Sequence, residues 1–192
     1  QSAIDLREAA RVQLKEWAMK KMRNDIINAL GMIDGTVYSS ATAGNKNTWT
    51  TNNVDRVLFG KLKSNYSATH STALANIDTT DDKLTANMVT LAKRIATTAS
   101  PIIRPLTING DEEWYVMFVD SLGYRDLKAD TAIQSANYYA RDRGKDNPLF
   151  TGSDLLYDGV IIREIPEIAS LGTVGASSST VSPGYLGGAQ SI

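Results

Sequence analysis

An unbroken helical pattern near the start of the chain constrains the fold more than any other feature of the sequence. Large apolar side chains recur at steps of three to five residues from about Ile4 to Leu30, which predicts a helix with one buried face. The predicted face consists of Leu6, Ala10, Leu14, Trp17, Met22, Ile26 and Leu30. Such a helix would be roughly 40 Å long at 1.5 Å per residue. It would therefore exceed the usual three to four turns of a helix in a globular domain.

A polar segment follows this helix. Residues 35–53 are rich in Thr, Ser, Asn, Ala and Gly, and they predict a long irregular excursion. Unstructured loops of this length are uncommon in compact domains unless they serve a function or touch a partner. We expect a second helix from about Thr80 or Asp81 to Thr98, with acidic residues in its first turn and Pro101 after its end.

The rest of the chain has a mixed helix and strand pattern. An apolar run from Trp114 to Val119 predicts a buried strand. Asp158-Gly159 between two apolar runs predicts a hairpin turn, because both central residues of such a turn need positive φ. Three further elements are expected: an extended segment Ile102–Ile108 and short helices Leu122–Ala129 and Ala132–Arg143. The predicted fold class is α+β.

Composition limits the classes of partner. The 192 residues are 42% hydrophobic, which is enough for a core of one or two domains. A net charge of -1 gives no basic excess for binding nucleic acid or an anionic membrane as the primary partner. No apolar run approaches the roughly 18 to 20 residues that span a bilayer. The absence of cysteine excludes disulfides, thiol nucleophiles and thiolate metal sites.

No catalytic, metal or cofactor site is predicted. His70, the single histidine, has no adjacent serine or acid to orient it, so we expect it to pack in a loop or lie on the surface. Three acidic groupings could be considered for chemistry, but each is expected to be solvated or to serve a turn or helix terminus. They are Asp78, Asp81 and Asp82; Asp111, Glu112 and Glu113; and Asp120, Asp126 and Asp130. The glycine-rich stretches match neither a phosphate-binding loop nor a dinucleotide fingerprint.

A set of aromatic, basic and loop residues suggests contact with a macromolecule. Tyrosine and arginine are enriched in protein interfaces, although they could also stack on single-stranded nucleic acid. We prefer contacts between subunits, with local folding as the open alternative. The candidate residues are Trp49, Tyr138, Tyr139, Arg141, Arg143, Asn147, Pro148 and Phe150.

A succession of segments resembles the major capsid protein family of N-four-type podoviruses and their prophage relatives. The most specific are NPLFTG at Asn147–Gly152 and LLYDGVIIREIPEI at Leu155–Ile168. The others, in the expected order, are REAARVQLKEWAMKKMRNDIINALGMI, RVLFG at Arg56–Gly60, PIIRPLTING at Pro101–Gly110, EEWYVMFVDSLGYRDLKAD at Glu112–Asp130, and GYLGGAQSI at Gly184–Ile192. One departure is Asp120-Ser121, where the family often has a histidine-proline pair.

The resemblance implies the HK97-like fold of tailed-phage capsids. Residues 1–35 would then be the spine helix of a peripheral domain. Residues 36–192 would be a mixed α/β region with axial-domain and peripheral-domain segments. The family's N-terminal arm and its C-terminal end would lie outside this chain.

The resemblance also implies a structural role. The chain would be a major capsid subunit that is made in the bacterial cytoplasm and assembles into hexamers and pentamers of an icosahedral virion head. Scaffolding and portal proteins would be its partners, and packaged DNA would be contacted only non-specifically, with no membrane involved. The alternatives are a carbohydrate-active or carbohydrate-binding α/β domain, using Asp111 to Glu113, Asp120 or Asp126 beside Trp114, or another structural protein of the phage head.

Overall fold

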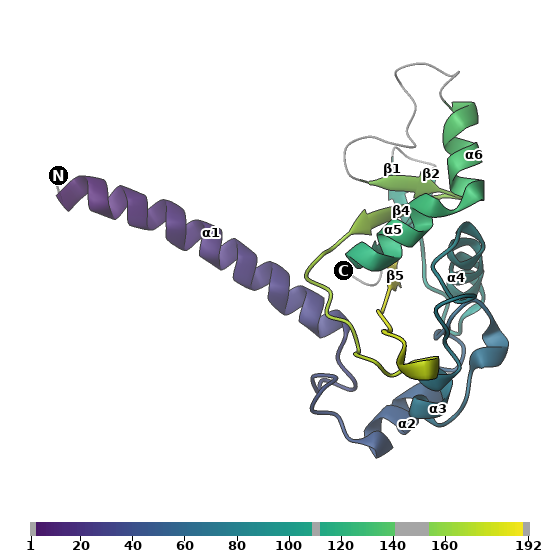
Figure 1. Cartoon of the computed structure of the whole chain (residues 1–192). Helices are drawn as coiled ribbons and strands as arrows, with labels where there is room; N and C mark the ends of the chain where they lie inside the picture. The colour runs from purple at the N-terminus through teal and green to yellow at the C-terminus, as the bar shows by residue number, and fades with distance from the viewer. Residues whose placement is uncertain (1–2, 109–111, 141–153, 190–192) are drawn as a thin grey trace. The chain divides into compact units, whose positions relative to one another are not determined.

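The computed structural model divides the chain into two compact units, Gln1–Ala41 and Thr42–Ile192, each of which is described by itself. The structure describes residues 3–108, 112–140 and 154–189. Figure 1 labels the helices and strands, which are coloured by residue number from the N-terminus to the C-terminus.

The first unit is built on one helix. Helix α1 covers Ala3–Leu30, as the apolar spacing predicts. It ends in a turn in which the Gly31 and Met32 amides donate to carbonyls three residues earlier, and Ile33 then exchanges both backbone hydrogen bonds with Thr36. The prediction that this helix buries one face is wrong, however. The seven apolar positions of the predicted face, from Leu6 to Leu30, span about 240° of the helix circumference at 100° per residue, and all of them are exposed.

The second unit begins with short helices around a small core. They are α2 (Ala43–Asn52), a 3₁₀ turn (Lys63–Asn65) and α3 (His70–Ala75). The α2 helix contradicts the prediction of an irregular excursion over residues 35–53. Its polar sequence is helical because Thr42 caps it, accepting from the Asn45 amide, and because Thr50 is fully buried. The core contains Phe59, Ala73, Leu74 and Val181.

Helix α4 covers Ala86–Thr98, so the predicted start at Thr80 or Asp81 is wrong, as is the acidic first turn. Aspartate side chains explain the late start. Asp78 and Asp82 accept hydrogen bonds from backbone amides of the preceding turn, which compete with helix formation there. The first helical amide, that of Ala86, instead donates to the Asp130 carboxylate at 2.9 Å.

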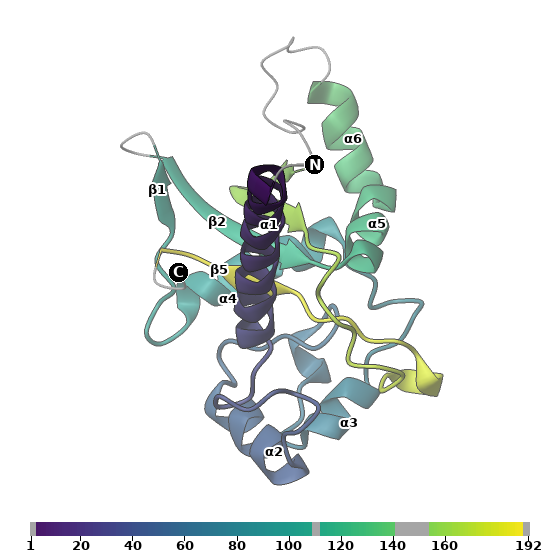
Figure 2. The same cartoon turned by 90° about the vertical axis from the view of Figure 1, so that its left-hand side faces the viewer.

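A small mixed sheet carries the main core. Its strands are β1 (Leu106–Ile108), β2 (Glu112–Val119), β3 (Leu155–Tyr157), β4 (Val160–Glu164) and β5 (Tyr185–Gly187). The order is β1-β2-β4-β3, with β5 antiparallel to β2 on the side away from β4. β2 and β4 run parallel, whereas β3 and β4 form the predicted hairpin through Asp158 (φ 49°) and Gly159 (φ 72°). Figure 2 shows β5 beside β2.

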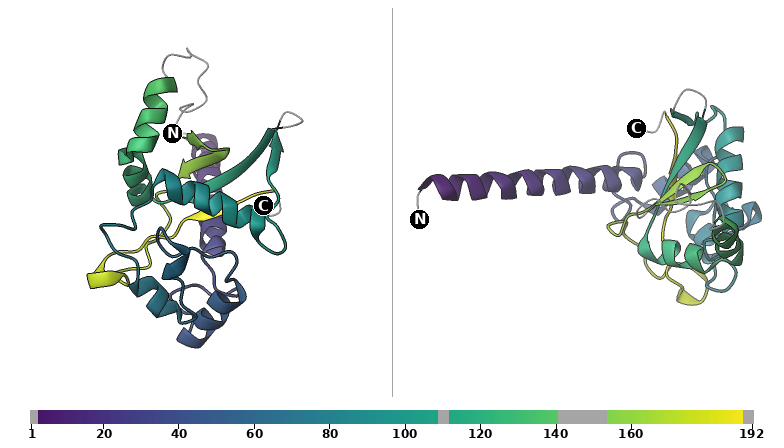
Figure 3. Two further views of the ribbon diagram at one scale, coloured as in Figure 1. Left: turned by 90° about the vertical axis from the view of Figure 1, so that its right-hand side faces the viewer. Right: turned by 90° about the horizontal axis from the view of Figure 1, so that it is seen from above.

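Two helices after β2 join the sheet in the same core. They are α5 (Ser121–Ala129), as predicted, and α6 (Thr131–Ala140), which is described as far as Ala140. One sheet face is buried through Tyr115, Met117 and Val119 of β2 and Val160 and Ile162 of β4. Val89 of α4, Leu127 of α5 and Ile133 of α6 belong to this cluster. Figure 3 shows α4 crossing the sheet in its left-hand view.

Only Leu106–Ile108 of the predicted extended segment Ile102–Ile108 forms a strand. The cause is β5, which pairs with Val116 to Phe118 of β2 where a longer β1 would have paired. The amide of Ala189, just after β5, donates to the carbonyl of Arg104 at 2.9 Å. The C-terminal strand therefore displaces the segment before Pro105 from β2.

Candidate interaction surfaces

The predicted contact residues fall in different parts of the chain. Trp49 lies in α2 and is half-buried, with its ring edge-on to His70 at a centroid distance of 6.4 Å. Tyr138 lies in α6 and is 70% exposed. Tyr139 is also in α6, but its side chain is outside the described residues. Five further candidates also lie outside them: Arg141, Arg143, Asn147, Pro148 and Phe150. A role in subunit contacts stays a prediction for the whole set.

His70 is buried at the start of α3, and its surroundings are structural. Its Nδ1 lies 2.8 Å from the Thr50 hydroxyl, which itself donates to the Lys46 carbonyl at 2.8 Å. A hydroxyl has one proton, so the His70 Nδ1–H must be the donor to Thr50 Oγ1. The ring also meets Phe59 edge-on at 5.8 Å. Burial lowers the pKa of the imidazole, and the charge of Lys46 lowers it further.

This geometry favours packing over chemistry at His70. The side chain hydrogen-bonded to its Nδ1 is that of a threonine whose own proton is held by a backbone carbonyl. Within the described ranges, no group of three histidine or acidic side chains could hold a metal ion. The prediction that His70 packs within a loop region therefore agrees with its place between α2 and the loop that carries Phe59.

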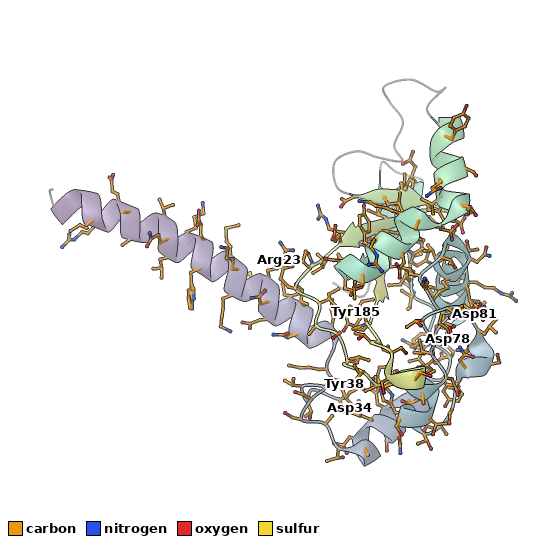
Figure 4. The ribbon with its side chains drawn as sticks, in the orientation of Figure 1. Arg23, Asp34, Tyr38, Asp78, Asp81 and Tyr185 are labelled. Carbon is orange, nitrogen blue, oxygen red and sulfur yellow. The ribbon has the colours of Figure 1, made fainter. Side chains whose placement is uncertain are left out.

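The first acidic grouping organises a turn. Asp82 accepts from the amides of Lys61 and Asp78, at 2.7 and 3.0 Å, and from the Asn65 side chain at 3.3 Å. Asp81 forms an ion pair with Lys61 at 2.9 Å. Amide hydrogen bonds, first that of Asp81, hold the pKa of Asp78 below its usual value. Figure 4 shows Asp78 and Asp81 beside one another. These carboxylates therefore stabilise the local backbone through hydrogen bonds and an ion pair.

Several carboxylates of the other two groupings also have local partners, whereas Glu113 is exposed in β2. Asp120 caps α5 by accepting from the Gly123 amide, and Asp126 pairs with the adjacent Arg125. Asp130 accepts from Ala132 as well as from Ala86. Glu112 accepts from the indole of Trp114 at 3.3 Å. Asp111 lies outside the described residues.

Exposed apolar side chains give the strongest surface signal, and they concentrate on α1. Large apolar residues along the helix are each 58–66% exposed: Leu6, Val12, Leu14, Trp17, Met19, Met22 and Ile26. A shallow groove on the helix is lined by Trp17, Ala18, Lys21, Met22, Asp25, Ile26 and Ala29. These side chains make α1 a candidate interaction surface, because large exposed apolar patches are typical of binding sites. No described helix is long and apolar enough to cross a membrane.

Comparisons with known proteins agree on one class. Residues 1–190 match the model of a family described as phage capsid protein. A solved structure, the capsid asymmetric unit of cyanophage Pam1, is 42% identical with a TM-score of 0.83, over 96% of this chain and 54% of that one. The capsid of Ralstonia phage GP4, at 19% identity, has a TM-score of 0.63 over 95% of this chain and 51% of that one, which supports the fold alone. The chain thus spans about half the length of these capsid chains. No curated protein sequence matched.

Proposed function

The chain belongs to the phage capsid protein family, and we propose that it is a shell-forming part of the major capsid subunit of a tailed-phage head. The observation that carries this proposal is the match of the family model to residues 1–190, together with a TM-score of 0.83 to the Pam1 capsid. The α+β fold agrees with that of the solved capsids.

The proposed activity is assembly and not catalysis. Subunits meet through complementary surfaces and form hexamers and pentamers, which close into an icosahedral shell. Head-to-tail contacts close into rings when their rotation permits, and many weak contacts per subunit add up to a stable particle. The roles of the described carboxylates in caps, turns and ion pairs support a structural function.

The finer assignments follow the family resemblance. We assign residues 1–35 to the spine helix of a peripheral domain, and residues 36–192 to a region with axial-domain and peripheral-domain segments. The subunit would be made in the bacterial cytoplasm and assembled with scaffolding and portal proteins. With a net charge of -1, this chain would contact packaged DNA only non-specifically.

Electron microscopy of the expressed capsid protein, with size-exclusion chromatography beside it, tests the proposal. We expect closed shells, or rings of five and six subunits, that form as the protein concentration rises. A stable monomer or small dimer, with no particles at any salt concentration or with co-expressed scaffolding protein, would contradict it.

A further inference from the structure

The edge of β2 that faces away from β4 has two partners. β1 pairs with residues 112–114 of this edge and β5 with residues 116–118, and both run antiparallel to β2. Residues 102–104, which precede β1, are not part of the sheet. The carbonyl of Arg104 instead accepts from the amide of Ala189, just after β5, at 2.9 Å. β5 therefore occupies the place that a longer β1 would take.

The register of β1, if continued, leads to the stretch of β2 that β5 now holds. Leu106 is opposite Trp114. Because antiparallel strands advance in opposite directions, Arg104 would lie opposite Val116 two residues further on. Residues 102–104 are thus a second possible partner for the stretch of β2 that now pairs with β5.

Pro105 does not prevent this pairing, although it has no amide hydrogen to donate. Opposite residues in an antiparallel pair alternate between those that exchange hydrogen bonds and those that do not. The amide of Tyr115 donates to the carbonyl of Gly159, just before β4, at 3.0 Å, so its polar groups point away from the β1 edge. Pro105 would be opposite Tyr115, at a position where no hydrogen bond is exchanged.

The side chains of both segments suit the same place in the sheet. Met117 of β2 faces the core and is 5% exposed. Leu186 of β5 is opposite Met117 now, and Ile103 would be opposite it after an exchange. Both are partly buried against the same core cluster, whereas Ile102 and Arg104 are exposed. Either segment therefore offers Met117 one apolar neighbour on the core face.

Each arrangement has contacts of its own. In the present one, the amide of Ile103 donates to the carbonyl of Ala96 and its carbonyl accepts from the Tyr115 hydroxyl, both at 3.0 Å. β5, however, has only three residues, all half-buried, whereas β4 pairs with β2 over five residues that include the fully buried Val160. Segments with few buried contacts open first, so β5 is the weaker of these two partners of β2.

We propose that β5 and residues 102–104 are alternative partners for residues 116–118 of β2, and that their exchange is a conformational switch that releases the C-terminal strand from the sheet. The incoming segment restores the hydrogen bonds that the outgoing strand leaves, so no backbone group of β2 stays unpaired. The switch lies within the second unit and does not depend on assembly. It therefore goes beyond the proposed function.

Pairs of introduced cysteines distinguish the two arrangements, since the 192 residues contain none. Arg104→Cys with Val116→Cys joins positions that are opposite only after the exchange, and Tyr185→Cys with Phe118→Cys joins positions that are opposite now. Opposite residues have Cα atoms about 5.5 Å apart, within reach of a disulfide, whereas two strands that flank a third are roughly 10 Å apart. Ile103→Cys with Val116→Cys is the matched control, because these side chains would point to opposite faces.

Oxidation of the unassembled capsid protein, followed by peptide mass spectrometry, measures the three disulfides. We expect the disulfide between positions 104 and 116 to form more slowly than that between 118 and 185, but several-fold faster than that between 103 and 116. Its absence when the 118 and 185 pair is fully oxidised would overturn the inference. Equal rates for the pairs from 104 and 103 would also overturn it, because they would indicate local unfolding without a defined register.

Hydrogen exchange tests the switch without cysteines. Leu186→Asp places a charge opposite the buried Met117 and should expel β5. The amides of Val116 and Phe118, which point to this edge, should then keep most of their protection because residues 102–104 replace the lost strand. Rapid exchange of both amides, with β4 still protected, would contradict the inference. Neither experiment needs shells, so its failure would leave the proposed function intact.

Discussion

At the scale of single residues, a buried polar contact between His70 and Thr50 lies beside the small core of the second unit, since the His70 ring meets Phe59 edge-on. His70 donates from Nδ1 to Thr50, and Thr50 donates to the Lys46 carbonyl, so both side chains are satisfied although both are buried. Removing one partner of such a pair leaves the other unsatisfied away from water, which costs more than the bond itself contributes.

Thr50→Val should therefore lower the free energy of unfolding by about 1–3 kcal/mol. Valine keeps the shape of the side chain but removes the acceptor for His70 Nδ1–H. Thr51→Val is the matched control, because the exposed Thr51 hydroxyl makes the same bond to the carbonyl four residues earlier, that of Asn47. We expect a change within about 0.5 kcal/mol there. Equal losses in urea unfolding would show that the contact to His70 contributes nothing.

His70 should also make stability depend on pH. Its folded pKa is lowered, first by burial and then by Lys46, so folding disfavours the protonated ring. The stability it permits is fully present above the unfolded pKa of about 6.5 and is lost as the pH falls below that value toward the folded pKa. Urea unfolding followed by tryptophan fluorescence at pH 7.5 and 5.5 should show this loss. His70→Gln should reduce the pH dependence; an unchanged slope would mean that another group titrates.

Gly60 is required by the Asp82 turn. Its φ is 63°, and a Cβ there would lie 2.2 Å from Asp82 Oδ1. Gly60→Ala should therefore lower the free energy of unfolding by about 1–2 kcal/mol for the left-handed backbone alone. It must also displace the Asp82 carboxylate, which accepts a hydrogen bond from the Lys61 amide. Gly172→Ala, with φ 90° and no atom within 4 Å, carries only the backbone cost. Thermal unfolding should place the Gly60 variant clearly below the Gly172 variant, and the reverse order would contradict this account.

At the scale of elements, a distant residue sets where α4 begins. Thr85 makes no capping bond with its side chain. Asp130, 44 positions after Ala86, accepts from the Ala86 amide, the first of the helix, and also from the amide of Ala132 in α6. Asp130→Ala should cost about 1–3 kcal/mol, since both helix starts lose an acceptor. Asp126→Ala is the control, because that carboxylate pairs with exposed Arg125. Chemical unfolding of the two variants measures the difference.

Local signals explain which elements the sequence predicts. The α1 helix, the β2 strand, α5 and the Asp158-Gly159 hairpin each follow from spacing or turn chemistry within a few residues. The start of α4 and the length of β1 depend instead on Asp130 and on β5, which are 44 and about 80 positions away. The helix α2 was missed because its polar sequence hides a cap at Thr42 and one buried side chain, Thr50.

The same distinction applies to the candidate surface. Helical spacing correctly predicts that α1 has apolar residues throughout, but a list of apolar positions at three to five steps does not show whether they share a side. The positions from Leu6 to Trp17 and those from Met19 to Ala29 form separate arcs only when their angles are compared. The resemblance to capsid proteins includes the segment of α1 itself, but it predicts the family without indicating how the apolar residues are distributed around the helix.

At the scale of the whole molecule, α1 should be the part whose stability depends most on assembly. A helix draws most of its stability from packing of its apolar side chains, and the large apolar side chains of α1 are exposed when it is considered by itself. The strands β2 and β4 pair over five residues and bury Val160 and Ile162 completely, so their hydrogen bonds belong to the fold of the subunit.

Hydrogen–deuterium exchange measured before and after assembly should separate these two kinds of element. We expect the amides of α1 to gain protection strongly in the shell, whereas the amides of β2 and β4 should be protected in both states. Peptides from α5 serve as a second internal control, because Leu127 is fully buried in the subunit core. Protection of α1 in the unassembled subunit equal to that of β2 would contradict this prediction, because the helix would then be stable without assembly.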